Sequence, residues 1–237
     1  MFWYFVSKFM HNKIAIVLLS GGQDSATCLA WAKKNFERVT AIGFDYGQKH
    51  RAEIEQAQKI ADVFEVEFVV FKLQDLLFGS SLVDHTQKVT DPHSINKELP
   101  SSFTAGRNAL FLTLAASYGY NFGISNIITG ICQTDYSGYP DCREDFRHAQ
   151  ECALSLALDT QINIIAPLMF LTKAETWKLA SELSDENFDV VEIVRTMTLT
   201  DYNGDLTVNE WGFGRLDNPA SELRARGYFE AKEKGWI

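Results

Sequence analysis

Residues 14–25 read Ile-Ala-Ile-Val-Leu-Leu-Ser-Gly-Gly-Gln-Asp-Ser and combine two signals in one short stretch. The first six residues are apolar, as in a strand that is buried on both faces of a sheet. The next six contain adjacent glycines, which let the backbone turn tightly and approach a ligand. A helix predicted over residues 25–34 follows, and a helix N-terminus attracts negatively charged groups. The stretch therefore predicts a phosphate-binding loop between the first strand and the first helix.

The side chains of this loop suit phosphate binding. The hydroxyl groups of Ser20 and Ser25 can donate to phosphate oxygens, and the Asp24 carboxylate beside them needs a counter-charge, for which we expect Mg²⁺. The Walker A pattern is absent, and Gly212-x-Gly214 later in the chain lacks the third glycine of a dinucleotide fingerprint. We therefore expect another class of nucleotide loop.

Apolar and amphipathic stretches alternate along the chain, which is typical of an α/β fold. Strands are predicted over residues 14–19, 39–44, 66–73, 126–131 and 163–166, and helices over 25–34, 50–63, 108–118, 146–156 and 172–183. We expect a doubly wound, mainly parallel five-stranded sheet with helices on both faces. Irregular chain is expected over residues 79–102 and 201–227, where turn residues are frequent and periodicity is weak.

These patterns divide the chain into three parts. They are an aromatic N-terminal tail (residues 1–12), a nucleotide-binding domain (13–195) and a short, irregular C-terminal lobe (196–237). The tail lacks the basic region and small-residue cleavage site of a signal peptide. We therefore expect it to precede the first strand as an appendage.

Composition excludes several classes of protein. Of the 237 residues, 46% are hydrophobic and 22% charged, which excludes a disordered chain, and the net charge is −9. Since the longest basic run is Lys33-Lys34, we expect no direct binding to nucleic acid. No apolar run is long enough to span a membrane. The four cysteines form no C-x-x-C pair, so we expect reduced thiols in a cytoplasmic protein.

Four further motifs lie after predicted strands or at predicted helix starts, where open α/β sheets bind ligands. They are Phe44-Asp-Tyr-Gly-Gln-Lys-His50 with Glu53, Gly106-Arg-Asn108, Thr134-Asp-Tyr-Ser-Gly-Tyr-Pro-Asp-Cys-Arg143, and Ala166-Pro-Leu168 before Lys173-Ala-Glu175. With the loop at residues 20–25, they resemble the QueC (7-cyano-7-deazaguanine synthase) family of the PP-loop ATP pyrophosphatase superfamily. The resemblance covers about residues 14–227.

The resemblance implies an adenine nucleotide alpha hydrolase-like fold and an ATP-dependent carbon–nitrogen ligase. The family converts 7-carboxy-7-deazaguanine and ammonia to 7-cyano-7-deazaguanine, which feeds queuosine biosynthesis. The acid is adenylated and aminated to an amide, and a second ATP activates the amide for dehydration. AMP and pyrophosphate are released. The resemblance also implies a homodimer.

Candidate ATP-binding residues follow from the matching positions: Leu19, Ser20, Gly21, Gly22, Asp24, Ser25, Asp45, Arg107, Asn108 and Lys173. Lys173 would neutralise phosphate charge, and Arg107 would form paired hydrogen bonds with a carboxylate or phosphate. Asn108 would bond a base or ribose. Lys173 can alternatively be an ordinary solvated lysine, and Asn108 can be only a helix cap.

Candidate substrate-binding residues are Tyr46, Gln48, Asp135, Tyr136, Tyr139, Asp141 and Arg143. The two tyrosines at 136 and 139 would stack on the flat deazaguanine, and Asp135 or Asp141 would accept from its guanidine-like edge, unless these carboxylates are turn formers. Candidate catalytic residues are Asp24, Gln48, His50, Arg107, Arg143 and Lys173. His50 can alternatively only begin its helix. Cys142 is expected to pack in a pocket wall.

The C-terminal stretch departs from the family in one respect. The family carries four zinc-binding cysteines there, and the flanking Thr200-Asp-Tyr-Asn203 and Leu223-Arg-Ala-Arg-Gly227 resemble the family's flanks. Aligned without gaps, the cysteine positions hold Asp201, Arg215, Asn218 and Ser221. We therefore expect no zinc, and an ion pair or a hydrogen-bonded cluster in its place.

Three other functions stay open at this stage. One is a related ligase that stops at the amide or transfers the acyl group to another amine. A second is a tRNA-thiolating enzyme, although the usual pair of catalytic cysteines and basic face are not evident. The third is an inactive nucleotide-binding protein, which the intact loop with Arg107, Arg143 and Lys173 argues against.

Overall fold

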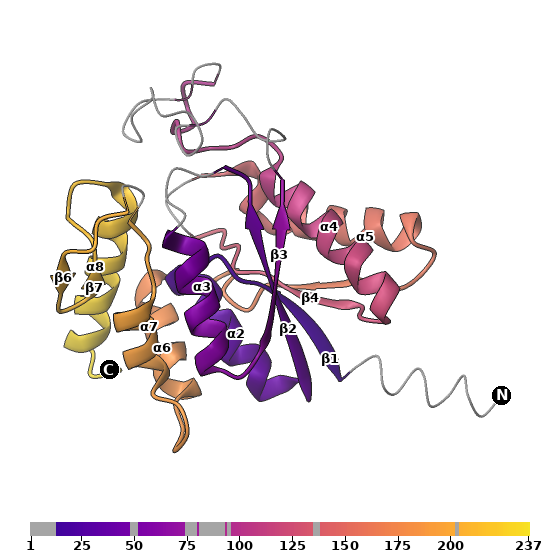
Figure 1. The fold of residues 1–237 in the computed structure, drawn as a ribbon. Coiled ribbons are helices and arrows are strands. Elements are labelled where there is room, and N and C mark those ends of the chain that lie inside the picture. Colours follow the sequence, from indigo (N-terminus) through magenta and orange to yellow (C-terminus); the bar gives the residue numbers. More distant parts are fainter. Residues whose placement is uncertain are drawn as a thin grey trace.

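A parallel five-stranded sheet organises the chain (Figure 1). The structure, a computed structural model, describes residues 13–47, 52–73, 80, 93, 96–134, 138–201 and 204–237. The strands are β1 (Ile14–Leu18), β2 (Arg38–Asp45), β3 (Glu67–Lys72), β4 (Asn126–Ile128) and β5 (Asn163–Ile165). Their order is β3-β2-β1-β4-β5 with every neighbouring pair parallel. The predicted doubly wound sheet is therefore confirmed, while the tail at residues 1–12 lies outside the described residues.

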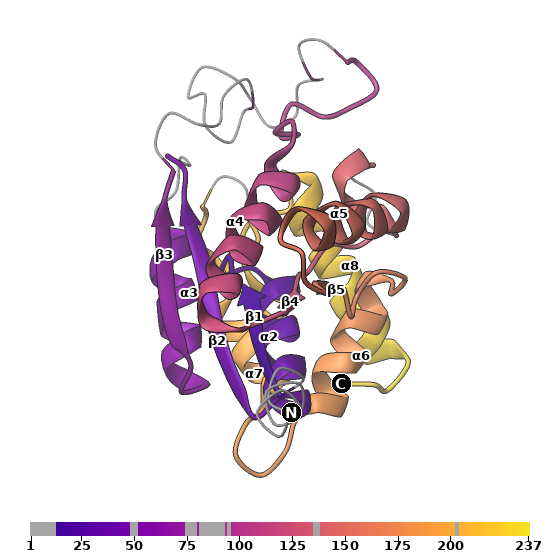
Figure 2. The same cartoon turned by 90° about the vertical axis from the view of Figure 1, so that its right-hand side faces the viewer.

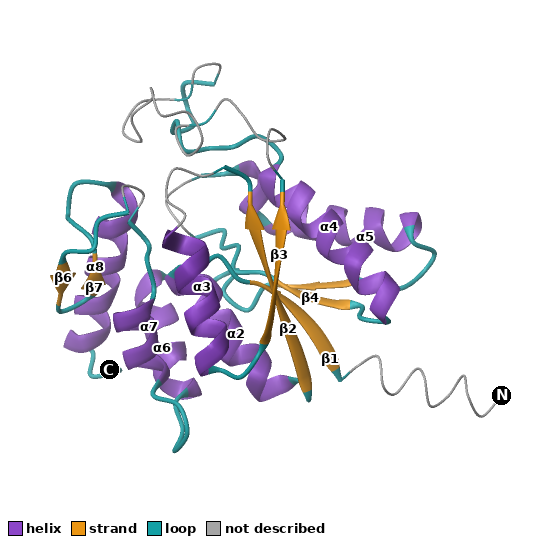
Figure 3. Ribbon diagram, viewed as in Figure 1, coloured by secondary structure: helices purple, strands orange, loops and turns teal. Residues whose placement is uncertain are grey.

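Helices cover both faces of this sheet (Figures 2 and 3). One layer contains α2 (Gln23–Asn35), α3 (Ala52–Val63), α6 (Lys173–Leu183), α7 (Val190–Met197) and α8 (Pro219–Glu233), and the other contains α4 (Arg107–Phe122) and α5 (Glu144–Ala157). Strand alternation explains the two cores: Ala15 and Val17 pack toward the first layer, and Ile16 between them packs toward the second. Among the described residues, no helix is long and apolar enough to cross a membrane.

The strand order creates a switch point beside β1. After β1 the chain builds β2 and β3 on one side, and then crosses over to build β4 and β5 on the other. The carboxyl ends of β1 and β4 therefore lead into connections that diverge, which opens a crevice at this edge of the sheet. The loop at residues 20–25 leaves β1 at this crevice.

The C-terminal lobe corrects one expectation. Residues 201–227 were predicted to be irregular, but α8 begins at Pro219, after a short hairpin of β6 (Val208–Asn209) and β7 (Gly212–Phe213). Asn218 caps α8, since its side chain accepts from the Ser221 N–H, and proline suits the first helical position. Helix α8 then packs on α6.

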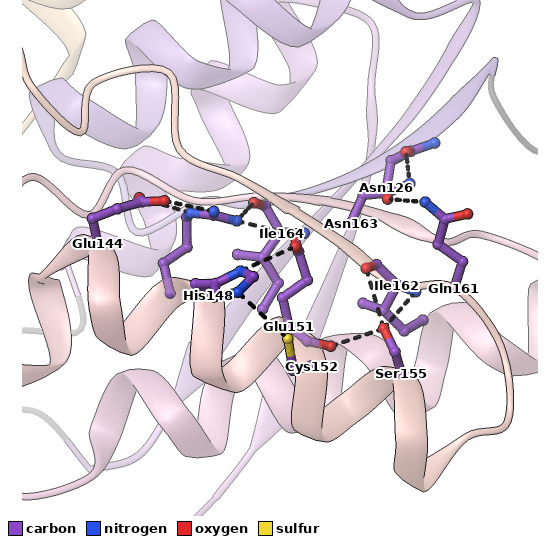
Figure 4. A network of polar contacts seen from close by, with 11 residues as sticks. Asn126, Glu144, His148, Glu151, Cys152, Ser155, Gln161, Ile162, Asn163 and Ile164 are labelled. Carbon is purple, nitrogen blue, oxygen red and sulfur yellow. Dashed lines mark hydrogen bonds and ion pairs between the residues drawn. The ribbon is translucent and has the colours of Figure 1, made fainter.

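Side chains of α5 close the outer edge of β5 (Figure 4). Arg147 Nη1 donates to the Ile164 carbonyl oxygen (2.7 Å), and Glu151 Oε2 accepts from the Ile164 N–H (2.8 Å). Arg147 also bonds Glu151 (2.9 Å) and forms paired hydrogen bonds with Glu144 (2.6 and 2.8 Å). The free backbone groups of an edge strand are thus satisfied from within the chain.

Replacing Arg147 should therefore weaken the fold. Arg147→Met leaves the Ile164 carbonyl and two carboxylates without their donor, and we expect a loss of about 1–3 kcal/mol in the free energy of unfolding, measured by urea titration. Arg195→Met is the matched control, because Arg195 forms the same paired bonds with Glu192 on one helix, and its loss should stay below about 1 kcal/mol. Equal losses in the two variants would contradict this role.

Candidate functional site

A cavity of about 300 Å³ lies at the carboxyl ends of β1, β2 and β4. Its walls come from the loop at residues 20–25 (the phosphate loop), the ends of these strands, the first turns of α3 and α4, the turn that contains Tyr139 and Cys142, and the segment after α7. The lining residues are Leu18, Leu19, Ser20, Gly22, Gln23, Asp24, Ser25, Ile42, Phe44, Tyr46, Glu53, Ile54, Arg107, Asn108, Phe111, Thr129, Gly130, Ile131, Cys132, Tyr139, Cys142, Leu199 and Thr200. The cavity brings together motifs that are far apart in the sequence.

The phosphate loop is stiffened by its own serines. The Ser20 and Ser25 hydroxyl oxygens lie 3.1 Å apart, the Ser25 hydroxyl donates to the Gly22 carbonyl (3.0 Å), and the Ser20 N–H donates to Ser25 Oγ (3.2 Å). Among the described residues, the backbone N–H groups of Asp24 and Ser25 at the start of α2 have no acceptor. These free donors suit an anion at the helix N-terminus.

Gly21 is required by both conformation and space. Its φ is +88°, and a Cβ there would lie 2.4 Å from the Glu53 carbonyl oxygen on α3. The loop thus packs directly on the backbone of α3, with no room for a side chain.

Lys173 and Asp24 meet at the loop. Lys173 Nζ lies 2.9 and 2.8 Å from the two Asp24 carboxylate oxygens. The Thr172 and Glu175 capping box fixes the start of α6 and hence the origin of the lysine. Gly227 of α8 packs against it, since a Cβ there would lie 2.8 Å from Lys173 Cβ. The lysine is therefore a largely buried cation that is paired with the loop carboxylate.

Another part of the cavity lining is aromatic and carries Arg107. Phe44 and Phe111 stack with ring centroids 4.0 Å apart, and Tyr46 lies 5.6 Å from Phe111. Arg107 begins α4 after Gly106, whose φ is +71°. The site thus joins a polar end, which suits phosphates, to a flat apolar end, which suits an aromatic ring.

Glu53 lies in the cavity lining, and the sequence motif after β2 predicts no role for it. Burial raises the pKa of its carboxyl to about 7, and the positive charge of Arg107 opposes the rise. Burial also raises the pKa of Tyr46, against the lowering effect of Arg107. A cavity carboxyl that titrates near neutral pH is a candidate proton acceptor or donor. The signal available in the sequence was its place in the first turn of a helix beside the loop.

Other predicted residues lie in the cavity wall or directly behind it and have internal partners. Asn108 Nδ2 donates to the Asp141 carbonyl oxygen (3.0 Å), and the Asn108 N–H donates to Asp141 Oδ2 (3.2 Å), so that Asp141 caps α4. The Tyr139 hydroxyl bonds the Ser102 hydroxyl (2.6 Å). Cys142 lines the cavity, as expected. These contacts show how α4 is fixed against the short 3₁₀ turn η1 (Pro140–Cys142).

Some predicted residues lie elsewhere. Asp45, Gly21, Asp141, Arg143 and Lys173 are not among the described cavity-lining residues, although Lys173 bonds Asp24, which is. Asp45 accepts from the Gly47 N–H (3.3 Å), which is a turn contact, and Arg143 is exposed just before α5. Gln48, His50, Asp135 and Tyr136 lie outside the described residues. The ligand roles of all these residues stay predictions.

The C-terminal lobe is organised around a buried carboxylate. Asp201 Oδ2 accepts from Asn218 Nδ2 (2.8 Å), the Ser221 hydroxyl (2.8 Å) and the Arg215 backbone N–H (3.1 Å). The Arg215 side chain instead pairs with Asp205, at 2.9 Å. The predicted hydrogen-bonded cluster is confirmed, and the alternative of an Asp201–Arg215 side-chain ion pair is wrong, because Arg215 turns outward.

This donor set does not fit zinc. One carboxylate, one amide, one hydroxyl and an arginine replace the thiolates and imidazoles that tetrahedral zinc sites use. The described residues contain no group of three or more His, Cys, Asp or Glu that could hold a metal ion.

The phosphate loop offers a single carboxylate, Asp24, beside the free N–H groups. This arrangement fits Mg²⁺, which proteins commonly bind through one or two carboxylates and the phosphates of a substrate.

The raised pKa of Glu53 gives a pH test. The pKa of Glu53 is higher in the folded chain than the ordinary 4.5. The ionised carboxylate therefore destabilises the folded state, fully above about pH 7, and this loss of stability becomes smaller as the pH falls toward 5. We expect Glu53→Gln to be more stable than wild type at pH 8, with the difference shrinking by on the order of 2 kcal/mol at pH 5, as measured by urea unfolding.

Glu55→Gln is the matched control, because Glu55 lies in the same first turn of α3 but is exposed. Its effect on stability should be small at both pH values, because an exposed side chain contributes little to the fold. A Glu53→Gln difference that is the same at pH 5 and pH 8 would show that Glu53 does not titrate in this range.

Comparison with known proteins identifies the family. The chain matches the family described as queuosine biosynthesis protein QueC over residues 14–232. It is 42% identical over 229 residues to a 7-cyano-7-deazaguanine synthase of Helicobacter pylori (strain P12), with 95% of this chain and 98% of that protein covered. A 7-cyano-7-deazaguanine synthase of Burkholderia mallei (strain SAVP1) is 42% identical over 223 residues, with 90% of this chain and 91% of that protein covered.

Among solved structures, an NMN synthetase from Francisella tularensis matches with a TM-score of 0.46 and 14% identity, covering 96% of this chain and 88% of that one. The family match and the two full-length relatives show that the chain belongs to the QueC family of queuosine biosynthesis proteins.

Proposed function

We propose that this protein is a 7-cyano-7-deazaguanine synthase, an ATP-dependent ligase that makes the nitrile from 7-carboxy-7-deazaguanine and ammonia. The observation that carries the proposal is a single cavity that joins an anion-binding loop to an aromatic wall bearing Arg107. The two relatives at 42% identity are synthases of this kind, and they match this chain over nearly their whole lengths.

In the first half of the reaction, the substrate carboxylate attacks the α-phosphorus of ATP, and pyrophosphate leaves. The free N–H groups of Asp24 and Ser25 would hold the leaving group while negative charge builds on it, and the Ser20 hydroxyl would join them by turning its proton from Ser25 to a phosphate oxygen. Lys173 would exchange part of its contact with Asp24 for the phosphates. Asp24 would then be a ligand of Mg²⁺, which would neutralise charge on the phosphate oxygens.

The acyl end of the substrate would face the aromatic part of the lining that carries Arg107. Arg107 would orient the carboxylate by paired hydrogen bonds. Ammonia then attacks the acyl adenylate, AMP leaves, and the excess proton must be taken up. Glu53 has a pKa of about 7, which suits it to accept that proton at neutral pH. Adenylation of the amide oxygen by a second ATP would release pyrophosphate, and loss of AMP together with the two amide N–H protons would give the nitrile.

The replaced metal site favours a second candidate, a ligase that stops at the amide. The Asp201 cluster directly follows Leu199 and Thr200, which line the cavity. A change in that lobe could therefore alter the second activation step while leaving the first intact.

We further propose a cytoplasmic homodimer that acts on a small molecule and does not bind nucleic acid directly.

The products distinguish these candidates. Purified protein, Mg-ATP, ammonium and 7-carboxy-7-deazaguanine should give 7-cyano-7-deazaguanine and two AMP per nitrile, measured by mass spectrometry. Amide without nitrile would support the second candidate. Unchanged acid would contradict both.

Matched lysine variants test the site in the same assay. Lys173→Met should lower product formation by roughly 100-fold or more, because it removes a cation from the ATP phosphates as pyrophosphate leaves. Lys178→Met on the same helix should leave the rate unchanged, because Lys178 is half-exposed and pairs with Glu182. Equal rates in the two variants would remove Lys173 from the proposed mechanism.

We also propose that the C-terminal lobe folds without zinc, with the Asp201 cluster in place of the metal. Prolonged treatment with a chelator should leave the melting temperature unchanged, whereas Asp201→Ala should cost about 2–4 kcal/mol, because the buried donors Asn218 and Ser221 and the Arg215 N–H lose their acceptor. Glu222→Gln, at an exposed position of the first turn of α8, is the control. Stoichiometric zinc in the untreated protein would overturn this proposal.

A further inference from the structure

Thr200 of the C-terminal lobe has a hydroxyl group that is arranged to donate into the cavity. Its Oγ1 accepts from Arg224 Nη1 (3.0 Å) and from the Gln23 N–H at the start of α2 (3.4 Å). A hydroxyl has two acceptor positions and one proton, so these two contacts leave only the proton. No group among the described residues accepts that proton, and Thr200 lines the cavity.

Gln23 beside it is also incompletely bonded. Its side chain is 2% exposed and lines the cavity, yet neither its amide nitrogen nor its amide oxygen has a hydrogen-bond partner in the described part of the chain. Buried amides are nearly always paired, because an unpaired polar group loses its hydration without compensation. The Gln23 amide thus adds to the unpaired N–H groups of Asp24 and Ser25 in the same turn of α2. A ligand with several acceptor oxygens would satisfy these N–H donors.

Arg224 of α8 supplies a buried positive charge behind Thr200. The residue is fully buried, and its five N–H groups are all bonded. The acceptors are the backbone carbonyls of Val194, Arg195, Thr198 and Trp211 and the hydroxyl of Thr200, at 2.9 to 3.3 Å. All five acceptors are neutral, so the hydrogen bonds fix the guanidinium without neutralising it.

The surrounding charges leave this cation uncompensated. Burial lowers the pKa of Arg224 to about 10, and the negative charge of Asp24 opposes that change, so the side chain is charged at neutral pH. Within the described residues, no carboxylate forms an ion pair with it, and Asp24 is already bonded to Lys173. A buried charge is costly unless an opposite charge lies near it. An anion in the cavity would supply that charge.

We propose that Thr200 and Arg224 form the C-terminal half of the phosphate site: Thr200 donates its hydroxyl proton to a pyrophosphate oxygen, and Arg224 positions Thr200 and adds its positive charge from behind. This inference rests on the proposed function for the identity of the anion as the pyrophosphate portion of ATP. Thr200 is a binding residue and Arg224 a positioning residue. The phosphate site thus extends beyond the loop at residues 20–25.

Thr200 variants test the contact directly, with inorganic pyrophosphate and Mg-ATP as separate probes in calorimetric titrations without the acid substrate. Thr200→Val keeps the shape but removes the hydroxyl, and it should weaken pyrophosphate binding about 10-fold or more. Thr200→Ser keeps the hydroxyl and should stay within about 3-fold of wild type. Equal affinities for Thr200→Val and wild type would overturn the proposal.

Arg224 variants separate the effect of its positive charge on pyrophosphate binding from the effect of its hydrogen bonds on the stability of the lobe. Arg224→Lys and Arg224→Gln both lose most of the five hydrogen bonds, but only the lysine retains the charge. We expect similar losses of stability in urea, with pyrophosphate bound at least 5-fold more tightly by the lysine variant. Equal affinities would show that Arg224 only braces the lobe. If neither variant folds, the Thr200 pair decides.

The outcomes also separate this inference from the proposed function. Nitrile formation with unaltered pyrophosphate binding in Thr200→Val would overturn the inference alone. The expected binding pattern without any conversion of 7-carboxy-7-deazaguanine would overturn the proposed substrate and support the phosphate site. Wild-type protein that binds neither pyrophosphate nor Mg-ATP would overturn both.

Discussion

The Gly21 carbonyl oxygen accepts a hydrogen bond from the Leu199 N–H (3.0 Å), and this contact ties the phosphate loop to the C-terminal lobe. On its other side, the same glycine packs against the Glu53 carbonyl of α3. The loop is thus clamped between elements that come from opposite ends of the chain. Its donors are fixed before any ligand arrives, so an anion would meet groups that need little reorganisation.

Sequence patterns predicted the sheet and the loop because their signals are local. The apolar run at residues 14–19 and the glycines behind it specify a buried strand and a tight turn without help from the rest of the chain. Helix α8 was missed because its buried face carries the small residues Ala225 and Ala231 beside Tyr228, which give a weak periodic signal. The start signal at Asn218 and Pro219 was present but was hidden in a stretch rich in turn residues.

The site was only partly predictable because several of its groups act through distant contacts. Thr200 stands 177 residues from Gln23, whose N–H it accepts, and no local pattern marks that pairing. Glu53 resembles any acidic residue in a first helical turn until the fold packs it beside Arg107. The sequence around Asp141 is compatible with a local turn, but in the fold its carboxylate accepts from the Asn108 N–H at the start of α4.

The closed edge of β5 also limits how copies of this chain can assemble. Arg147 and Glu151 occupy the outward N–H and carbonyl groups of Ile164, which another strand would need for pairing. Two copies cannot join their sheets into one continuous sheet across β5 without first breaking this network. A symmetric pair would therefore have to meet through helices, loops or the opposite edge at β3, and its interface would depend on side-chain packing and on main-chain groups other than those of β5.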